Sequence, residues 1–188
     1  MSEPGAFVLQ CGGAPLHVAP ASGRTYRIVA RKASVCGALV DEALRSPAAE
    51  VVPAFGGLLN GSSVLENILR PAVYHRRIPT EDVAERAYRA FAACGIERAQ
   101  VDDLCGYSVQ DLGSLDRRLV ALVRSLLLLP ALLVLERLFE GLTARDAERA
   151  ACFGSYYRRV VPSGTLIYCD LAGISCPDVG ADEQVEAR

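Results

Sequence analysis

The segment from Leu112 to Thr143 constrains the fold more than any other, because it joins a helix-length stretch to a short aliphatic run through one proline. Apolar residues dominate Leu119–Leu135, but Arg124 lies near the middle of this stretch and Pro130 interrupts it. A membrane-spanning helix needs about 20 consecutive apolar residues. The sequence therefore predicts an amphipathic helix before the proline and a fully buried strand, Ala131–Leu135, after it.

The composition of the chain indicates one domain with an aliphatic core. Its 188 residues match the size of a single large domain, and 51% of them are hydrophobic although Trp is absent. The net charge of −2 and the lack of a long basic stripe argue against nucleic acid as a partner. The N-terminus has no basic region followed by a long apolar run, so we expect no signal peptide and a cytoplasmic protein.

The cysteines and histidines do not form the spacing of a metal site. Seven cysteines are spread along the chain without a C-x-x-C pair, and His17 and His75 fall outside any usual zinc-ligand spacing. We therefore predict no metal ligand. The thiols are expected to be small buried side chains in a reducing compartment.

The first fifty residues are predicted to form short strands and one helix. Residues 7–9, 16–18 and 26–29 are extended runs separated by turn-rich clusters, which predicts an antiparallel meander. Apolar residues follow a helical period over Ser34–Leu44, and Ser34 stands where an N-cap would be.

The middle of the chain alternates one short strand with helices. Val51–Val52 is a strand candidate, and a glycine-rich FGGLLNGSS loop follows it. Ser63 and Glu66 fit a capping box, in which each side chain satisfies an exposed amide of the other. Thr80 opens the clearest helix of the sequence, and Gly95 closes it.

The remaining elements complete an α/β pattern. Ser114 is placed to cap the next helix, and Thr165–Cys169 predicts another buried strand. The acidic tail, 177–188, lacks apolar periodicity and is expected to be disordered. We therefore predict one α/β domain over residues 1–176, with a small antiparallel β start and a helical subdomain over about residues 63–125.

The order of these elements resembles the nucleotide-binding ATPase subunit of an ATP-binding cassette (ABC) transporter, over about residues 5–172. The stretch RRLVALVRSLLLLPALLVLE resembles the signature helix running into the Walker B strand, and GGLLNGSSVLENILRP resembles the segment after the Q-loop. The stretches VLENILRPAVYH and LLVLERLFEGL are closest to ATPase subunits of phospholipid (MCE-type) transporters. The resemblance implies a truncated, degenerate P-loop core of the ABC-ATPase type.

The resemblance places the phosphate loop at residues 30–38, where the required chemistry is missing. Backbone amides of a glycine-rich loop wrap the phosphates, a lysine contacts the terminal ones and a hydroxyl binds magnesium. Here Cys36 stands in place of the lysine and Gly37 in place of the hydroxyl, and Val35 cannot easily take a positive φ. Arg31 or Lys32 could still attract an anion at the following helix N-terminus. A solvated loop is the alternative.

Other positions implied by the resemblance have also changed. Ala54 stands for the glutamine of the Q-loop, and residues 112–116 replace the signature with a sequence that ends in an acid. Glu136 keeps a carboxylate at the Walker B position, but Arg137 replaces the general base and cannot accept a proton. Asp170 falls near the position of the γ-phosphate-sensing histidine. Losses at separate positions argue against hydrolysis.

We therefore expect a pseudo-ATPase rather than an enzyme, with no catalytic residue, no bound cofactor and no metal. Lys32, Ser34, Gly37 and Glu136 are the degenerate nucleotide-site positions, and they would bind ATP and Mg only if the chain is a divergent active subunit that energises transport. A free-standing cytoplasmic regulator is a further alternative. Glu136 and Arg137 could also form a simple strand-end ion pair with neighbours, of little energetic weight if it is exposed.

The expected role is that of an adaptor or structural subunit of a bacterial membrane transporter for lipids. The expected partners are a membrane permease subunit and either a second copy or an active ATPase subunit, which would hold the chain peripherally on the cytoplasmic side of the inner membrane. Phe55, Leu58 and Leu59 are the candidate contacts, because a glycine-rich loop has little reason to carry them uncovered. Alternatively, the protein's own helices cover them.

Overall fold

The computed structural model describes residues 7–11, 14–18, 20–76 and 79–187. A five-stranded parallel sheet runs through the protein in the order β4-β5-β6-β3-β7. Its strands are β3 (Thr25–Ala30), β4 (Ala49–Val52), β5 (Leu132–Glu136), β6 (Thr165–Leu171) and β7 (Glu183–Ala187). The helices are α1 (Ala33–Ala43), α2 (Val64–Arg76), α3 (Thr80–Ala93), α4 (Arg98–Cys105), α5 (Ser114–Leu127) and α6 (Ala144–Val160), with a short 3₁₀ turn, η1, at Val109–Asp111.

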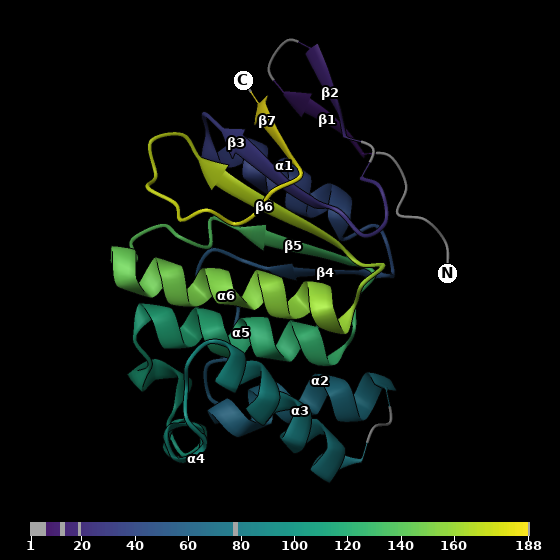
Figure 1. The fold of residues 1–188 in the computed structure, drawn as a ribbon. Coiled ribbons are helices and arrows are strands. Elements are labelled where there is room, and N and C mark those ends of the chain that lie inside the picture. The colour runs from purple at the N-terminus through teal and green to yellow at the C-terminus, as the bar shows by residue number, and fades with distance from the viewer. Residues whose placement is uncertain (1–6, 12–13, 19, 77–78, 188) are drawn as a thin grey trace.

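The helices lie in layers on both sides of the sheet. Helix α1 covers one face, α5 and α6 lie side by side below the other, and α2, α3 and α4 form a further layer beyond α5 (Figure 1). Strand β5 separates two cores because its side chains alternate between the faces. Leu132 and Val134 pack with α1, whereas Leu133 and Leu135 join the larger core around α5 and α6.

The central prediction of a helix, a proline and a buried strand is confirmed. Helix α5 ends at Leu127, a left-handed residue at Leu129 (φ 49°) turns the chain, and β5 begins just after Pro130. The strand starts one residue later than predicted, at Leu132, and its first four residues are fully buried.

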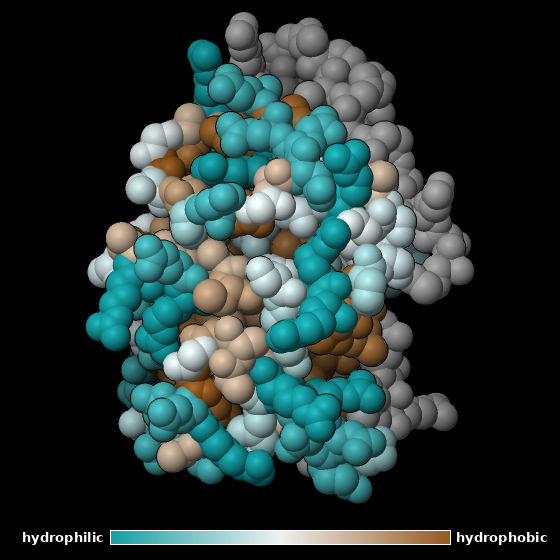
Figure 2. Space-filling view, in the orientation of Figure 1, coloured by the Kyte–Doolittle hydropathy of each residue, from teal (hydrophilic) through white to brown (hydrophobic). Residues whose placement is uncertain are grey.

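Among the described residues, no helix combines the length and the apolar character that a membrane crossing requires. Figure 2 shows hydrophilic residues spread among smaller apolar patches on the α6 side.

Two local predictions in the helical region are confirmed. The Ser63 amide donates to Glu66 Oε2 at 2.9 Å and the Glu66 amide donates to Ser63 Oγ at 3.2 Å, so the capping box begins α2 as expected. Gly95 ends α3 with φ 72°, and the Ile96 amide donates to Phe91 O at 3.1 Å. This is the glycine-terminated helix end that the sequence indicates.

Two predicted N-caps are wrong. Lys32 is the N-cap of α1, so Ser34 lies inside the helix rather than before it. Gly113 is the N-cap of α5, so Ser114 is the first helical residue. Each helix begins one or two residues earlier than the serine suggests, because glycine or an extended residue can also take the N-cap conformation.

The β start is only partly as predicted. Strands β1 (Phe7–Cys11) and β2 (Ala14–Val18) do form an antiparallel hairpin. The third run does not continue the meander, because β3 lies inside the parallel sheet between β6 and β7.

The expectation of a disordered tail from residue 177 is wrong over Glu183–Ala187, which forms β7 at the sheet edge beside β3. The Thr25 amide donates to Asp182 Oδ2 at 2.7 Å and the Asp182 amide donates to Thr25 O at 2.8 Å, which fixes the start of the strand. Backbone pairing therefore orders a segment whose side chains show no apolar pattern.

Candidate functional site

The connection between β3 and α1 contains only Arg31 and Lys32, since the strand ends at Ala30 and the helix begins at Ala33. A phosphate loop needs a longer run of backbone whose amides converge on the phosphates. No residue from 25 to 43, all of which are described, has a positive φ. The region therefore forms no backbone cradle.

The predicted nucleotide-site residues on this connection do not converge on one point. Lys32 is an exposed, extended residue with φ −134° and ψ 142°, and Ser34 is exposed in the first turn of α1. Gly37 lies within α1, where an added Cβ would meet no atom within 4 Å. These residues are arranged as an ordinary helix start, which leaves one amide-lined helix end and no loop around it.

Cys36, which stands in place of the lysine, faces the sheet and is completely buried. Its thiol shares a hydrogen bond with the thiol of Cys169 on β6. This hydrogen bond and burial raise the pKa of Cys169 well above its usual range. The same contact lowers the pKa of Cys36. Both side chains lie in the apolar layer between α1 and the sheet.

The end of β5 carries an ion-pair cluster in place of a hydrolytic pair. Arg137 Nε lies 3.5 Å from Glu136 Oε1, and Arg137 Nη1 lies 3.1 Å from Glu140 Oε2. The Arg137 amide donates to Cys169 O at 2.7 Å with Arg137 in a left-handed conformation, φ 47°. The second oxygen of Glu136 accepts the Ala54 amide at 3.3 Å. Both Glu136 oxygens thus contact protein groups.

Asp170 lies at the end of β6 and is 1% exposed. Its Oδ2 accepts a hydrogen bond from Arg27 Nε at 3.3 Å, and the thiol of Cys176 lies 3.5 Å from the same oxygen. Burial raises the pKa of Asp170, and Arg27 opposes this shift. Within the described residues, Oδ1 has no hydrogen-bond partner. The position that the resemblance assigns to a histidine is therefore held by a buried acid paired with arginine.

The region that resembles the ABC signature has an acid in the first turn of its helix. Gly113 is the N-cap of α5 and Leu112 is buried. Asp116 lies in the first turn of α5, and burial raises its pKa while Arg149 opposes the shift. An acid at this helix start disfavours a second anion there.

Across the described residues, no group of three or more His, Cys, Asp or Glu side chains could hold a metal ion.

The predicted partner contacts divide into exposed and partly buried residues. Phe55 is 73% exposed and Leu59 is 55% exposed, and both lie in the loop between β4 and α2. Leu58, by contrast, is partly buried and packs against the larger core. The interpretation that the protein covers its own loop therefore applies to Leu58, while Phe55 and Leu59 remain uncovered in this chain.

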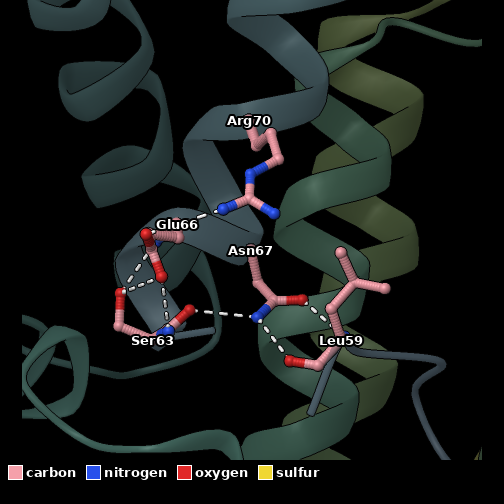
Figure 3. Close-up of polar contacts among 5 residues, drawn as sticks. All are labelled: Leu59, Ser63, Glu66, Asn67 and Arg70. Atoms are coloured by element: carbon pink, nitrogen blue, oxygen red, sulfur yellow. Dashed lines mark hydrogen bonds and ion pairs between the residues drawn. The ribbon is translucent and has the colours of Figure 1, made fainter. Parts of the chain in front are cut away.

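Sequence analysis did not single out the side chains that hold this loop. Asn67 on α2 is 2% exposed, and its Oδ1 accepts the Leu59 amide at 2.8 Å (Figure 3). Its Nδ2 donates to Leu59 O at 3.2 Å and to Ser63 O at 3.0 Å. Arg124 on α5 donates from Nη1 to Gly57 O at 2.9 Å and from Nη2 to Gly56 O at 3.4 Å.

Two of the three arginines on α5 donate to backbone carbonyls of other segments. Arg124 binds the loop, and burial lowers the pKa of its guanidinium. Arg118 is 4% exposed and donates to Glu140 O at 2.5 Å, which ties α5 to the turn after β5. Arg117 does cap backbone locally, by donating to the carbonyls of Leu112 and Gln110. For Arg124 and Arg118, the signal in the sequence was a charged residue among the apolar residues of the helix.

The fold is that of the ATPase cassettes of ABC transporters. The dimeric ATP-binding cassette MJ0796, in a post-hydrolysis state with ADP and Pi, superposes with a TM-score of 0.64 at 14% identity and covers 88% of this chain and 84% of its own. CbiO1 from Clostridium perfringens, described as part of the ABC transporter complex cbiONQ, gives a TM-score of 0.64 at 15% identity. The match covers 83% of this chain and 70% of that chain. A second dimeric MJ0796 structure gives a TM-score of 0.64 at 12% identity, and the match covers 87% of this chain and 84% of that chain.

These similarities lie in the structure and not in the sequence, since no protein-family model and no curated protein sequence matches the chain. At 12–15% identity, the comparison defines an α/β fold of the ABC-ATPase class. Roles of individual residues do not follow from it. What the chain does has to be argued from its own side chains.

Proposed function

We propose that this chain is a pseudo-ATPase that serves as an adaptor or structural subunit of a membrane transporter. The observation that carries the proposal is the two-residue connection between β3 and α1, where Arg31 and Lys32 replace a phosphate-binding loop. The groups at the ends of β5 and β6 support it, because Glu136 and Asp170 are engaged by protein groups instead of facing an open site.

The proposed partner is a membrane permease subunit that contacts the loop between β4 and α2. CbiO1, which shares the fold, is described as part of an ABC transporter complex. Phe55 and Leu59 are large apolar side chains exposed on a loop, as expected for residues that a partner covers. We further propose that the transported substrate is a lipid, on the likeness of VLENILRPAVYH to MCE-type subunits, and that the chain acts peripherally on the cytoplasmic side of the inner membrane.

A paired charge substitution tests this role. We expect Phe55→Asp with Leu59→Asp to leave the protein folded, because both side chains are exposed, and to abolish co-purification of a permease from detergent-solubilised native membranes. Leu58→Asp is the matched control, since Leu58 packs against the core and the substitution should lower the melting temperature instead. Intact association of a folded double variant would reject the interface.

A further inference from the structure

Two buried cysteines face each other between α1 and the parallel sheet. Cys36 lies on the side of α1 that also buries Leu39 and Ala43, and this side packs against the sheet. Side chains of β6 alternate between the two faces of the sheet, so Cys169 points towards α1 together with Ile167. Both cysteine side chains are 0% exposed. The packing of α1 on β6 therefore brings two thiols from distant parts of the sequence to one place.

The two thiols share a hydrogen bond in which they play different parts. The bond lowers the pKa of Cys36 and raises the pKa of Cys169, so the Cys169 thiol donates and the Cys36 sulfur accepts. Burial and the carboxylate of Glu136 oppose the shift of Cys36, whereas the positive charge of Arg137 supports it. The thiolate is the nucleophilic form of cysteine. Cys36 is therefore the more nucleophilic member of the pair.

The other described thiols are not arranged as such a pair. Cys94 and Cys152 interact through charge, and burial raises the pKa of Cys94 to about 12. The Cys176 thiol has a carboxylate as its neighbour, since it lies 3.5 Å from Asp170 Oδ2. Cys152 is the exposed thiol of this group. Direct contact between two thiols is therefore particular to Cys36 and Cys169 among the described cysteines.

The first turn of α1, which contains Cys36, is weakly fastened. Its N-cap, Lys32, makes no side-chain hydrogen bond to the helix, and the turn contains no acidic residue. Because the first amides of a helix need such partners, an uncapped turn opens at low cost. Lys32 and Ser34 are already exposed at this helix start. Local opening of the turn therefore gives a small molecule access to Cys36 without global unfolding.

We propose that Cys36 and Cys169 form an oxidative modification site, at which hydrogen peroxide converts the two thiols to a disulfide that locks α1 onto β6. The Cys36 sulfur attacks one peroxide oxygen and the O–O bond breaks, which leaves a sulfenic acid on Cys36 and releases water. The Cys169 sulfur then attacks the Cys36 sulfur, the S–O bond breaks and a second water leaves. The peroxide thus gains two electrons, and both thiol protons end in water.

The disulfide changes the stability of the fold because it joins residues that are far apart in the sequence. Closing a long loop removes conformational freedom from the unfolded chain and so stabilises the folded one. The sulfurs already touch in the folded protein, so the bond needs a small approach of α1 to the sheet. A thiol reductant reverses the reaction by exchange. The site uses neither a nucleotide nor a transporter partner, so it is independent of the proposed function.

Peptide mapping of the purified full-length chain tests this site. The reduced protein is treated with hydrogen peroxide, its remaining thiols are blocked with iodoacetamide, and it is digested without reductant. We expect a linked pair of peptides that contain Cys36 and Cys169, two hydrogens lighter than the free peptides together and separable by dithiothreitol. The melting temperature of the oxidised protein should rise by about 5–10 °C, and dithiothreitol should reverse the rise.

Single substitutions separate the parts of the two thiols. Cys169→Ala should stop the reaction at the sulfenic acid of Cys36, which dimedone traps, whereas Cys36→Ala should leave Cys169 as a free thiol. Cys152→Ala is the matched control and should keep both the linkage and the rise in melting temperature, because the exposed Cys152 lies outside the pair. Lys32→Ser supplies an N-cap to α1 and should slow the linkage about fivefold.

Four results would overturn the inference. One is oxidation of Cys152 while Cys36 and Cys169 remain free thiols. Another is a linkage that forms only in denaturant, which would mean that the two sulfurs do not meet in the folded chain. The third is a linkage that leaves the melting temperature unchanged, and the fourth is an equal rate of linkage in Lys32→Ser and the wild type. No measurement involves ATP or a permease, so failure of this site is distinguishable from failure of the proposed function.

Discussion

Two connections at the same edge of the sheet differ sharply in this protein. The connection after β3 has two residues and leads straight into α1, with no residue from 25 to 43 in a left-handed conformation. The connection after β4 runs over residues 53–63, contains three glycines with positive φ and is held by side chains from β5, α5 and α2. This edge of the sheet therefore carries a two-residue connection after β3 and a longer loop after β4 that other elements hold.

The comparison shows that the chain keeps this fold with only two residues between β3 and α1. Cys36 and Cys169 are buried core side chains between α1 and the sheet. Glu136 contacts a loop amide and an arginine. Both sides of the sheet retain continuous apolar cores around β5. Since burial supplies most of the stabilisation, the fold does not require a phosphate loop.

The largest expected effect on stability comes from placing a lysine at position 36 of α1, the helix after the two-residue connection. Cys36→Lys should destabilise the protein by about 3–5 kcal/mol, because position 36 is completely buried in an apolar core and the larger, charged side chain would lose its hydration there. Denaturant unfolding measures this, with Cys36→Ala as the control that removes the thiol and adds no charge. If Cys36→Lys were as stable as the wild type, position 36 would face solvent and the comparison of the two connections would fail.

The shared core gives the next largest effect. Leu133→Ala in β5 should cost about 2–5 kcal/mol, since the side chain is completely buried between the sheet and α5. Leu59→Ala, the same change on the exposed loop, should alter the free energy of unfolding by less than about 0.5 kcal/mol. Equal melting temperatures for the two variants would contradict the placement of either leucine.

A small stabilisation is expected from substitution of the glycine inside α1, the helix that follows the two-residue connection. Gly37 lies inside α1 and has room for a Cβ, so Gly37→Ala should stabilise the protein by about 0.5–1 kcal/mol. The matched change on the second loop, Gly56→Ala, should destabilise it, because φ is 83° and Arg117 O lies in the way. Opposite signs in thermal unfolding would confirm that only the second connection uses glycine for its conformation.

Patterns that depend on neighbours in sequence were predictable. Pro130 and the aliphatic run after it define β5, and Ser63 with Glu66 defines the start of α2, because both features act over a few residues. The α/β class followed from their order. Strand β7 was not predictable, since EQVEA has no apolar alternation and is ordered by backbone pairing with β3.

The candidate site was only partly predictable for a related reason. The missing residues at positions 36, 54 and 137 can be read from the sequence once a register is set. That the connection after β3 shrinks to two residues depends on where α1 begins, which local signals placed incorrectly. The roles of Asn67 and Arg124 depend on a loop that lies near them only in the folded chain.

Isothermal titration of the purified chain with Mg-ATP tests the central claim most directly, combined with an assay of phosphate release. The account predicts no heat beyond dilution and no turnover in the wild type. It predicts the same for Arg137→Glu, because a restored base at that position still lacks a phosphate loop before α1. Saturable micromolar binding by the wild type, or measurable turnover by Arg137→Glu alone, would contradict the account.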